Sequence, residues 1–240
     1  MKEEKNKISI FFLFFSCLIL VFIGVSFYRF SEKKNHLRKE IEKKTLMIDS
    51  LSLVNRLLKI ENEALKTDQF YLVVNSRNGR FYLKKRDKVV YEGPCGVGLG
   101  KKKFPDEKAQ LKEWDFETPL GERIVKEVIK DPYWIRPNWF WLEQGLTVPP
   151  PDSMIIIPDY LTFEEAILAY EELTPEERLL VKNVPGYLGK YKIDLGNGYF
   201  VHFGEISKEF RVSHGCIRVS KEDLEILQQV LKKGSSVFIF

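Results

Sequence analysis

Residues 202–218 read His-Phe-Gly-Glu-Ile-Ser-Lys-Glu-Phe-Arg-Val-Ser-His-Gly-Cys-Ile-Arg, and they hold two of the chain's three histidines and one of its three cysteines. A free thiol has a pKa of about 8.5 and is mostly protonated at neutral pH, so a nucleophilic cysteine needs an imidazole within hydrogen-bond reach. His202 lies in the strand-like run 198–203, and His214 stands two residues before Cys216. We expect a single hairpin to bring His202 against the Cys216 sulfur.

These residues resemble the signature of the L,D-transpeptidase (YkuD-type) catalytic domain. That signature has a His at a strand end, a short loop, then Ser-His-Gly-Cys, an aliphatic residue and Arg or Asn. Residues 213–218 read Ser-His-Gly-Cys-Ile-Arg, and His202 precedes them on a strand-like run. One departure is Phe203, which stands where the family usually has Gly or Ser. The resemblance extends over residues 68–240, including a Thr-Pro-x-Gly-Glu turn at 118–122.

The resemblance implies acyl transfer on a peptidoglycan stem peptide, without a cofactor or a metal ion. Cys216 would attack the carbonyl of the third stem residue to form a thioester, and His202 would be the general base. The backbone N–H groups of Gly215 and Cys216 would stabilise the oxyanion. Ser213 and His214 would shape the loop around the sulfur.

Arg218 is a candidate for binding a stem-peptide carboxylate, because a guanidinium can hold a carboxylate through two parallel hydrogen bonds. A structural ion pair with Glu222 or Asp223 is the alternative. Tyr187 or Tyr191 is a candidate for adding a hydroxyl group to the site.

The segment 131–141 is unusually rich in aromatic residues for a loop. The hypothesis is that Trp134, Trp139 and Trp141 wall the substrate groove. The alternative is that they form a small core beneath a long loop.

The chain has 240 residues, 44% hydrophobic content and a formal net charge of +4, with basic and acidic residues interspersed. This pattern indicates a solvated surface and gives no basic patch for nucleic acid. Residues 8–27 are almost wholly apolar, and about 20 helical residues span a bilayer core of about 30 Å. We therefore predict a cytoplasmic tip and membrane helix in residues 1–30. A cleaved signal peptide, or a lipoprotein site at Cys17, is the alternative.

Basic residues flank both ends of the apolar run, so charge alone does not place the C-terminal domain outside. The resemblance places the C-terminal domain outside, because the substrate of the family lies outside the cell membrane. It implies a single-pass protein of the bacterial cytoplasmic (inner) membrane with the catalytic domain on the periplasmic or extracellular side.

Residues 31–67 contain no Gly or Pro and are rich in Lys, Glu and Leu, which favours one helical stalk about 55 Å long. A heptad seam predicts a parallel homodimer, since Asn at core positions favours that state; a monomeric stalk is the alternative. The seam consists of Ile41, Lys44, Ile48, Leu51, Asn55, Leu58, Asn62 and Leu65.

Residues 68–240 show short strands with close turn signals at 69–74, 80–83 and 88–91, which predict a mainly β fold of the YkuD-like sandwich or barrel type. Capping-box patterns start short inserted helices at 162–172 and 175–183, and Ser220 starts another. The glycine-rich run 96–100 lacks the ending of a phosphate loop and is interpreted as turn chemistry. Cys95 is expected to be a buried free thiol.

Three other interpretations stay open. His202, His214 and Cys216 are possible zinc ligands, although the close spacing of the last two is awkward around a tetrahedral ion. A sortase or papain-like protease also uses Cys and His, but their motif contexts are absent. A non-catalytic wall-binding scaffold, or a carboxypeptidase that uses water as acceptor, would share the same domain organisation.

Overall fold

The computed structural model describes the backbone of residues 2–66 and 68–240, and the side chains of residues 25–52, 54–55, 58–59, 61–66 and 68–240. Helix α1 runs through Lys2–Leu65. Among the residues described in full, no helix is both long and apolar enough to cross a membrane. Most of the predicted span 8–27 lies outside those residues.

The chain forms two compact units, Met1–Asn55 and Arg56–Phe240. In the first unit, the predicted seam residues Ile41, Ile48 and Leu51 are 64%, 65% and 54% exposed. The dimer therefore stays a prediction from the sequence. In the second unit, the last turns of α1 contact the strands through an ion pair between Glu61 and Lys84.

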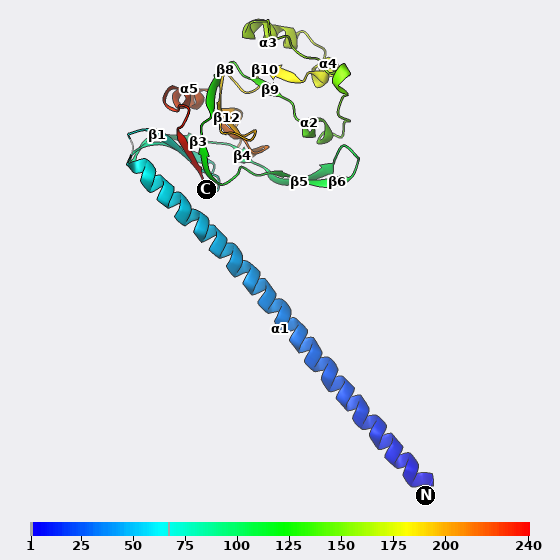
Figure 1. Ribbon diagram of the computed structural model, residues 1–240. Helices are drawn as coiled ribbons and strands as arrows, with labels where there is room; N and C mark the ends of the chain where they lie inside the picture. Colours follow the sequence, from blue (N-terminus) through cyan, green and yellow to red (C-terminus); the bar gives the residue numbers. More distant parts are fainter. Residues whose placement is uncertain (1, 67) are drawn as a thin grey trace. The chain divides into compact units, whose positions relative to one another are not determined.

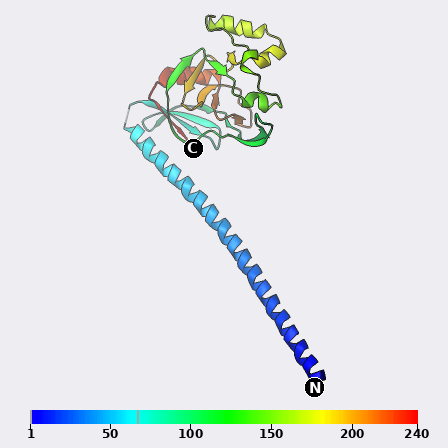
Figure 2. The same cartoon turned by 45° about the vertical axis from the view of Figure 1, so that its right-hand side comes forward.

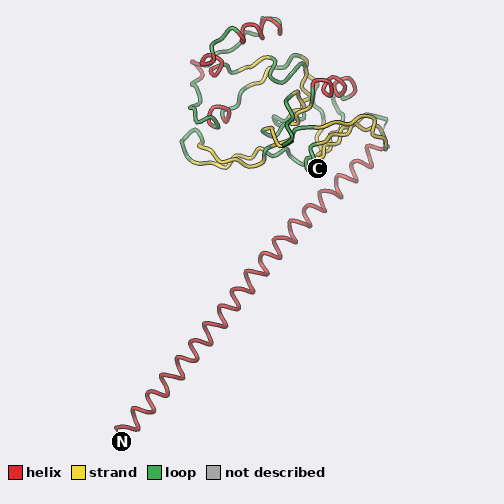
Figure 3. The backbone as a smooth tube through the Cα atoms, turned by 180° about the vertical axis from the view of Figure 1, so that it is seen from behind, coloured by secondary structure: helices red, strands yellow, loops and turns green. Residues whose placement is uncertain are grey.

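Two sheets build the second unit, and Figure 3 shows their strands in yellow. A five-stranded sheet has the order β3-β2-β1-β15-β7, with β1 and β15 parallel. Its strands are β1 (Phe70–Asn75), β2 (Arg80–Lys85), β3 (Lys88–Pro94), β7 (Gly121–Ile124) and β15 (Ser236–Ile239). The three predicted strands at 69–91 are confirmed as β1, β2 and β3. The mainly β class is confirmed as well.

A second, four-stranded sheet has the order β14-β12-β11-β8. Its strands are β8 (Glu127–Lys130), β11 (Tyr191–Asp194), β12 (Phe200–Phe203) and β14 (Ile217–Val219). Strands β12 and β14 are parallel, so the predicted hairpin between them is wrong. The chain leaves this sheet after β12, forms β13 (Arg211–Ser213) beside β4 (Val97–Gly98), and returns.

One continuous core joins both sheets to helix α5 (Lys221–Val230). Leu72 of β1, Val201 of β12, Ile217 of β14 and Leu227 of α5 are all at most 1% exposed. Each such side chain contributes about 1.5–3 kcal/mol on burial. The packing thus fixes β12 and β14, the two strands that flank the motif.

The glycine-rich run is extended rather than a turn, which corrects the expectation for residues 96–100. Gly96 forms a bridge with Arg218, and Gly98 pairs with Ser213. A Cβ at Gly98 would lie 2.0 Å from the carbonyl oxygen of Phe116. Glycine is needed here because neighbouring backbone approaches too closely for a side chain.

Residues 131–190 form an insert whose base is closed by a hydrogen bond from the Asp131 N–H to the Lys190 carbonyl (2.8 Å). Its helices and small strands lie together in Figures 1 and 2. They are β9 (Tyr133–Ile135), α2 (Trp139–Leu142), the 3-10 turn Pro151–Ser153, α3 (Phe163–Glu171), α4 (Pro175–Leu180) and β10 (Asn183–Pro185). The remaining strands, β5 (Gly100–Pro105) and β6 (Leu111–Phe116), form a separate hairpin.

Both predicted capping boxes are confirmed, with Thr162 and Glu165 at the start of α3 and Thr174 and Glu177 at the start of α4. Helix α4 ends at Leu180, before the predicted end at residue 183. The reason is that the following residues join the strands of the insert, where Asn183 opens β10 opposite β9.

Trp141 belongs to the core of the insert, which corrects its predicted place in the groove wall. Its side chain is 1% exposed, and its indole N–H donates to the Leu179 carbonyl (2.8 Å). Replacing Trp141 by Ala should lower the free energy of unfolding by about 3–5 kcal/mol. Trp141→Phe keeps most of the packing and loses the hydrogen bond, so it should lower the free energy of unfolding by less than Trp141→Ala does. Urea unfolding followed by circular dichroism measures both, and equal stability of all three chains would contradict this placement.

Candidate active site

A cleft of about 360 Å³ opens on the four-stranded sheet and is bordered by the insert. It brings together nearly all of the predicted site residues. Those lining it are Cys216, His202, Ser213, His214, Arg218, Trp139, Tyr187 and Trp134. Trp141 and Tyr191 do not line it; Tyr191 packs against the main core.

His202 and Cys216 approach each other through the parallel pairing of β12 with β14. Val201 pairs with Ile217, and side chains alternate along a strand. His202 and Cys216 therefore project from the same face of the sheet, one on each of two adjacent segments. Both line the cleft, where the Cys216 thiol donates a long hydrogen bond to the Gly198 carbonyl (3.8 Å).

The ring of His202 is held by its own strand. Nδ1 lies 2.6 Å from the Phe203 carbonyl oxygen, and an oxygen acceptor requires Nδ1 to carry the proton. This leaves Nε2 as the unprotonated nitrogen for the cleft. The sequence could not show which group fixes the tautomer of His202; in the structure the Phe203 carbonyl is in place to do so.

The pKa values describe an uncharged pair at rest. Burial lowers the pKa of His202 to about 4, with Arg218 and Lys192 adding to the shift and the Phe203 carbonyl opposing it. Burial raises the pKa of Cys216 to about 11, although the backbone at Phe200 and the same two cations oppose this shift. At neutral pH the site therefore holds a thiol and a neutral imidazole.

The loop carrying Cys216 is held by hydroxyl groups on either side. Ser213 Oγ accepts from the Gly215 N–H (3.2 Å) and donates to the Cys216 carbonyl. Thr118 Oγ1 donates to the Gly215 carbonyl (3.0 Å) and accepts from the Gly98 N–H (2.8 Å). The Gly215 N–H is thus engaged by Ser213, and its role as an oxyanion donor stays a prediction.

Gly215 itself is required by conformation. Its φ is +108° and a Cβ there would lie 2.8 Å from a ring carbon of Tyr199. Only glycine adopts this backbone without strain.

A profile of the L,D-transpeptidase catalytic domain (YkuD) matches residues 69–239.

The chain belongs to this family.

Several solved structures are similar, and each of these matches covers 72% of this chain. A mutant of Enterococcus faecium L,D-transpeptidase has 16% identity, a TM-score of 0.42 and 50% of its own length covered. Mycobacterium tuberculosis L,D-transpeptidase 1 has 13% identity, a TM-score of 0.40 and 62% covered. The catalytic domain from the E. faecium enzyme has 16% identity, a TM-score of 0.40 and 98% covered. The chain thus spans about half to three fifths of the first two. No curated protein matched it.

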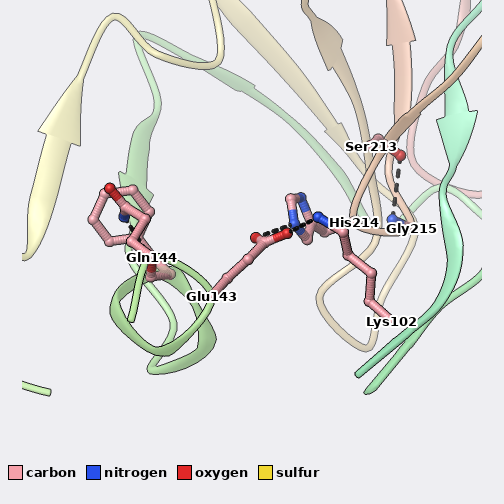
Figure 4. Close-up of polar contacts among 7 residues, drawn as sticks. Lys102, Glu143, Gln144, Ser213, His214 and Gly215 are labelled. Carbon is pink, nitrogen blue, oxygen red and sulfur yellow. Dashed lines mark hydrogen bonds and ion pairs between the residues drawn. The ribbon is translucent and has the colours of Figure 1, made fainter. Parts of the chain in front are cut away.

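In this YkuD domain, His214 is fixed by the insert (Figure 4). Its Nε2 lies 2.7 Å from a carboxylate oxygen of Glu143, the residue after α2, and Lys102 of β5 forms an ion pair with the same carboxylate. The imidazole also stacks on Trp139, with ring centroids 4.0 Å apart and planes at 14°. Phe116 meets the same imidazole edge-on, with ring centroids 4.5 Å apart. Trp139 therefore both lines the cleft and supports the motif loop.

The electrostatics of this contact favour a neutral histidine bound to a charged carboxylate. Burial would raise the pKa of Glu143, but the hydrogen bonds from Lys102 and His214 outweigh it and lower that pKa. Burial lowers the pKa of His214, against the opposing effect of Glu143. His214, the residue before Gly215, therefore donates its Nε2 proton to Glu143.

Arg218 lines the cleft, and the predicted alternative of an ion pair with Glu222 or Asp223 is not formed among the described residues. Asp223 instead accepts a hydrogen bond from the Tyr91 hydroxyl (2.7 Å). At the opposite wall, Tyr187 stacks on Trp134 with ring centroids 4.2 Å apart.

Three contributors to the site were missed by sequence reasoning. The sequence did contain a signal for Lys192, because a hairpin that turns at Asn197 places Lys192 opposite His202. The observed strand pairing is the same. Thr118 was noted only as part of a turn. Glu143 had no signal, because it lies 71 residues from His214 in the chain. Within the described residues, no group of three or more potential metal ligands is gathered.

The raised pKa of Cys216 predicts its reactivity toward iodoacetamide. Because the thiolate forms only as the pH approaches about 11, alkylation of Cys216 should keep rising from pH 7 to pH 10. A preformed thiolate–imidazolium pair would instead react at a constant rate above about pH 6. Peptide mass mapping separates Cys216 from Cys95, which is fully buried and should remain unmodified in the folded chain. A plateau reached below pH 7 that disappears in His202→Gln would contradict the neutral pair.

Removing the Glu143 carboxylate should slow the reaction of Cys216 with a stem-peptide donor, because His214 loses the group that fixes the motif loop. Glu143→Ala should reduce the rate about tenfold, within the range for a charged hydrogen bond. Glu143→Gln should be milder, since its amide oxygen still accepts from His214.

The matched control is Glu113→Ala. It removes an exposed partner of Lys101 on the β5–β6 hairpin, the hairpin that also carries Lys102. The rate and the pH profile are both measured. Equal rates for Glu143→Ala and the control would show that the contact positions nothing.

Proposed function

We propose that this chain is a peptidoglycan L,D-transpeptidase with Cys216 as nucleophile and His202 as general base. In the first step, the Cys216 sulfur bonds to the carbonyl carbon of the third stem residue, and the thiol proton passes to His202 Nε2. The amide C–N bond then breaks, and His202 returns the proton to the leaving D-amino acid.

In the second step, an acceptor amine attacks the thioester carbonyl while His202 takes its proton. The C–S bond breaks, and the proton returns to the Cys216 thiolate. An amine from a neighbouring stem gives a cross-link, whereas water gives an L,D-carboxypeptidase. Either reaction remodels the cell wall.

The observation that carries this proposal is the hydrogen bond from His202 Nδ1 to the Phe203 carbonyl. It leaves Nε2 as a lone-pair donor in the cleft that Cys216 also lines. A neutral base beside a thiol is the arrangement that proton transfer on attack requires. Membership of the family supports the same reaction class.

Other residues have supporting roles in the proposal. The Cys216 N–H is the proposed oxyanion donor, since Ser213 engages that of Gly215. His214 holds the loop against the insert. Arg218, Trp139 and Tyr187 are proposed to bind the stem peptide, with the guanidinium taking a carboxylate and the aromatic rings covering the peptide chain.

We also propose the setting that the sequence predicted. Residues 8–27 would anchor a single-pass protein in the bacterial cytoplasmic membrane, and residues 31–67 would hold the catalytic domain near the wall on the far side. The apolar seam of the stalk favours a parallel homodimer. These points rest on the sequence pattern, and they affect where the enzyme acts rather than its chemistry.

The test is mass spectrometry of the intact chain after incubation with a disaccharide-tetrapeptide. The unmodified chain should gain the mass of the acyl group at Cys216, and Cys216→Ala should gain none. His202→Gln should acylate about 100- to 10,000-fold more slowly, the usual contribution of a general base.

Cys95→Ala is the matched control, because Cys95 is a buried thiol outside the cleft, and it should acylate normally. A wall-binding scaffold would bind the donor with no adduct in any variant. An adduct that persists in Cys216→Ala would reject Cys216 as the nucleophile.

A further inference from the structure

Two cations flank the proposed general base in a row across the four-stranded sheet. Lys192 of β11 pairs with His202 of β12, and His202 pairs with Arg218 of β14. Paired residues on neighbouring strands point to the same face. All three side chains accordingly line the cleft with Cys216.

The charge of this row is not balanced by the protein. The cleft lining contains Lys192 and Arg218 but no Asp or Glu. Neither cation forms an ion pair within the part of the chain that the structure describes, and the Lys192 ammonium instead lies 4.5 Å from the centre of the Phe200 ring. Asp194, on the same face of β11, accepts from the Gly196 N–H (2.6 Å) and does not line the cleft.

Placing two cations beside a base has a cost unless an anion joins them. Each disfavours protonation of His202, and like charges in a cleft repel each other where water screens them less. An incoming carboxylate would remove this repulsion and would be held by charge-assisted hydrogen bonds. The arrangement is therefore suited to an anionic group within a few ångströms of the reacting carbonyl.

We propose that Lys192 and Arg218 form one anion site that binds a free carboxylate of the acyl donor, close to the scissile amide. The site makes the enzyme selective for donors that carry this carboxylate over donors in which it is an amide. The inference rests on the proposed function, since it assigns the donor that the cleft accepts. Two carboxylates qualify by position, the terminal one of the leaving residue and a side-chain one on the third residue.

The experiment compares acylation rates of the full chain with three tetrapeptide donors: the free acid, the C-terminal amide, and the peptide with an amidated third-residue side chain. At least one amide should react about 10- to 100-fold more slowly than the free acid, as expected for a charge-assisted hydrogen bond. The donor that loses reactivity identifies the bound carboxylate.

Variants at the two cations separate recognition from thiol activation. Lys192→Gln and Arg218→Gln should each slow the free acid about tenfold more than they slow the amide of the recognised carboxylate. Arg218→Lys should keep most of the preference, and Lys190→Gln, an exposed lysine outside the cleft, should behave like the unmodified chain. High salt should reduce the ratio of the free-acid rate to the amide rate, because it screens the two cations.

The outcome that overturns the inference is an equal slowing of acid and amide donors in the variants, or no preference in the unmodified chain. In that case the two cations only change the pKa of the Cys216 thiol.

Binding of the same peptides to the full chain carrying Cys216→Ala gives a second readout that needs no catalysis. Tighter binding of the free acid, lost with Lys192→Gln, supports the anion site even if no adduct forms on Cys216. A missing adduct by itself rejects the proposed function. Equal binding of acid and amides rejects the anion site.

Discussion

The parallel pairing of β12 with β14 is the constraint on which the site depends. It sets His202 and Cys216 on one face of one sheet, while the core beneath both strands keeps their spacing fixed. A parallel pair cannot be closed by a tight turn, so the chain must leave the sheet and come back. The excursion through β13 is therefore a requirement of this register, and it leaves Cys216 on a loop at the start of β14.

Such a loop would be mobile without further restraint, and the structure supplies it from both sides. Gly96 exchanges two backbone hydrogen bonds with Arg218, and the Val97 and Leu99 N–H groups donate to the Phe210 and Ser213 carbonyls. This close approach is possible because Gly96 and Gly98 have no side chain in the way. Thr118 and Ser213 then fix the carbonyls of Gly215 and Cys216. Most of this restraint comes from backbone and hydroxyl groups, whose hydrogen bonds do not change with pH near neutrality.

Local patterns were readable from the sequence, whereas contacts between distant segments were not. The capping boxes and the first strands follow from residues a few positions apart, and both appear in the structure. The hairpin expected between His202 and Cys216 was wrong because strand direction depends on the whole sheet. Trp141 and Trp139 are two residues apart, yet one lies in the core and the other in the cleft; no sequence pattern separates them, because the fold of the insert decides it.

The insert connects one wall of the cleft with the loop that carries Cys216. It carries Trp134 and Trp139 on the cleft wall, and it also carries Glu143, which holds His214. A change in the position of α2 would therefore move the wall and the support of the motif loop together. Opposite this wall, Lys192 and Arg218 belong to the sheet, whose register is set by the core. The cleft thus has one face fixed by the β core and one face set by the insert, and the stem peptide would lie between them.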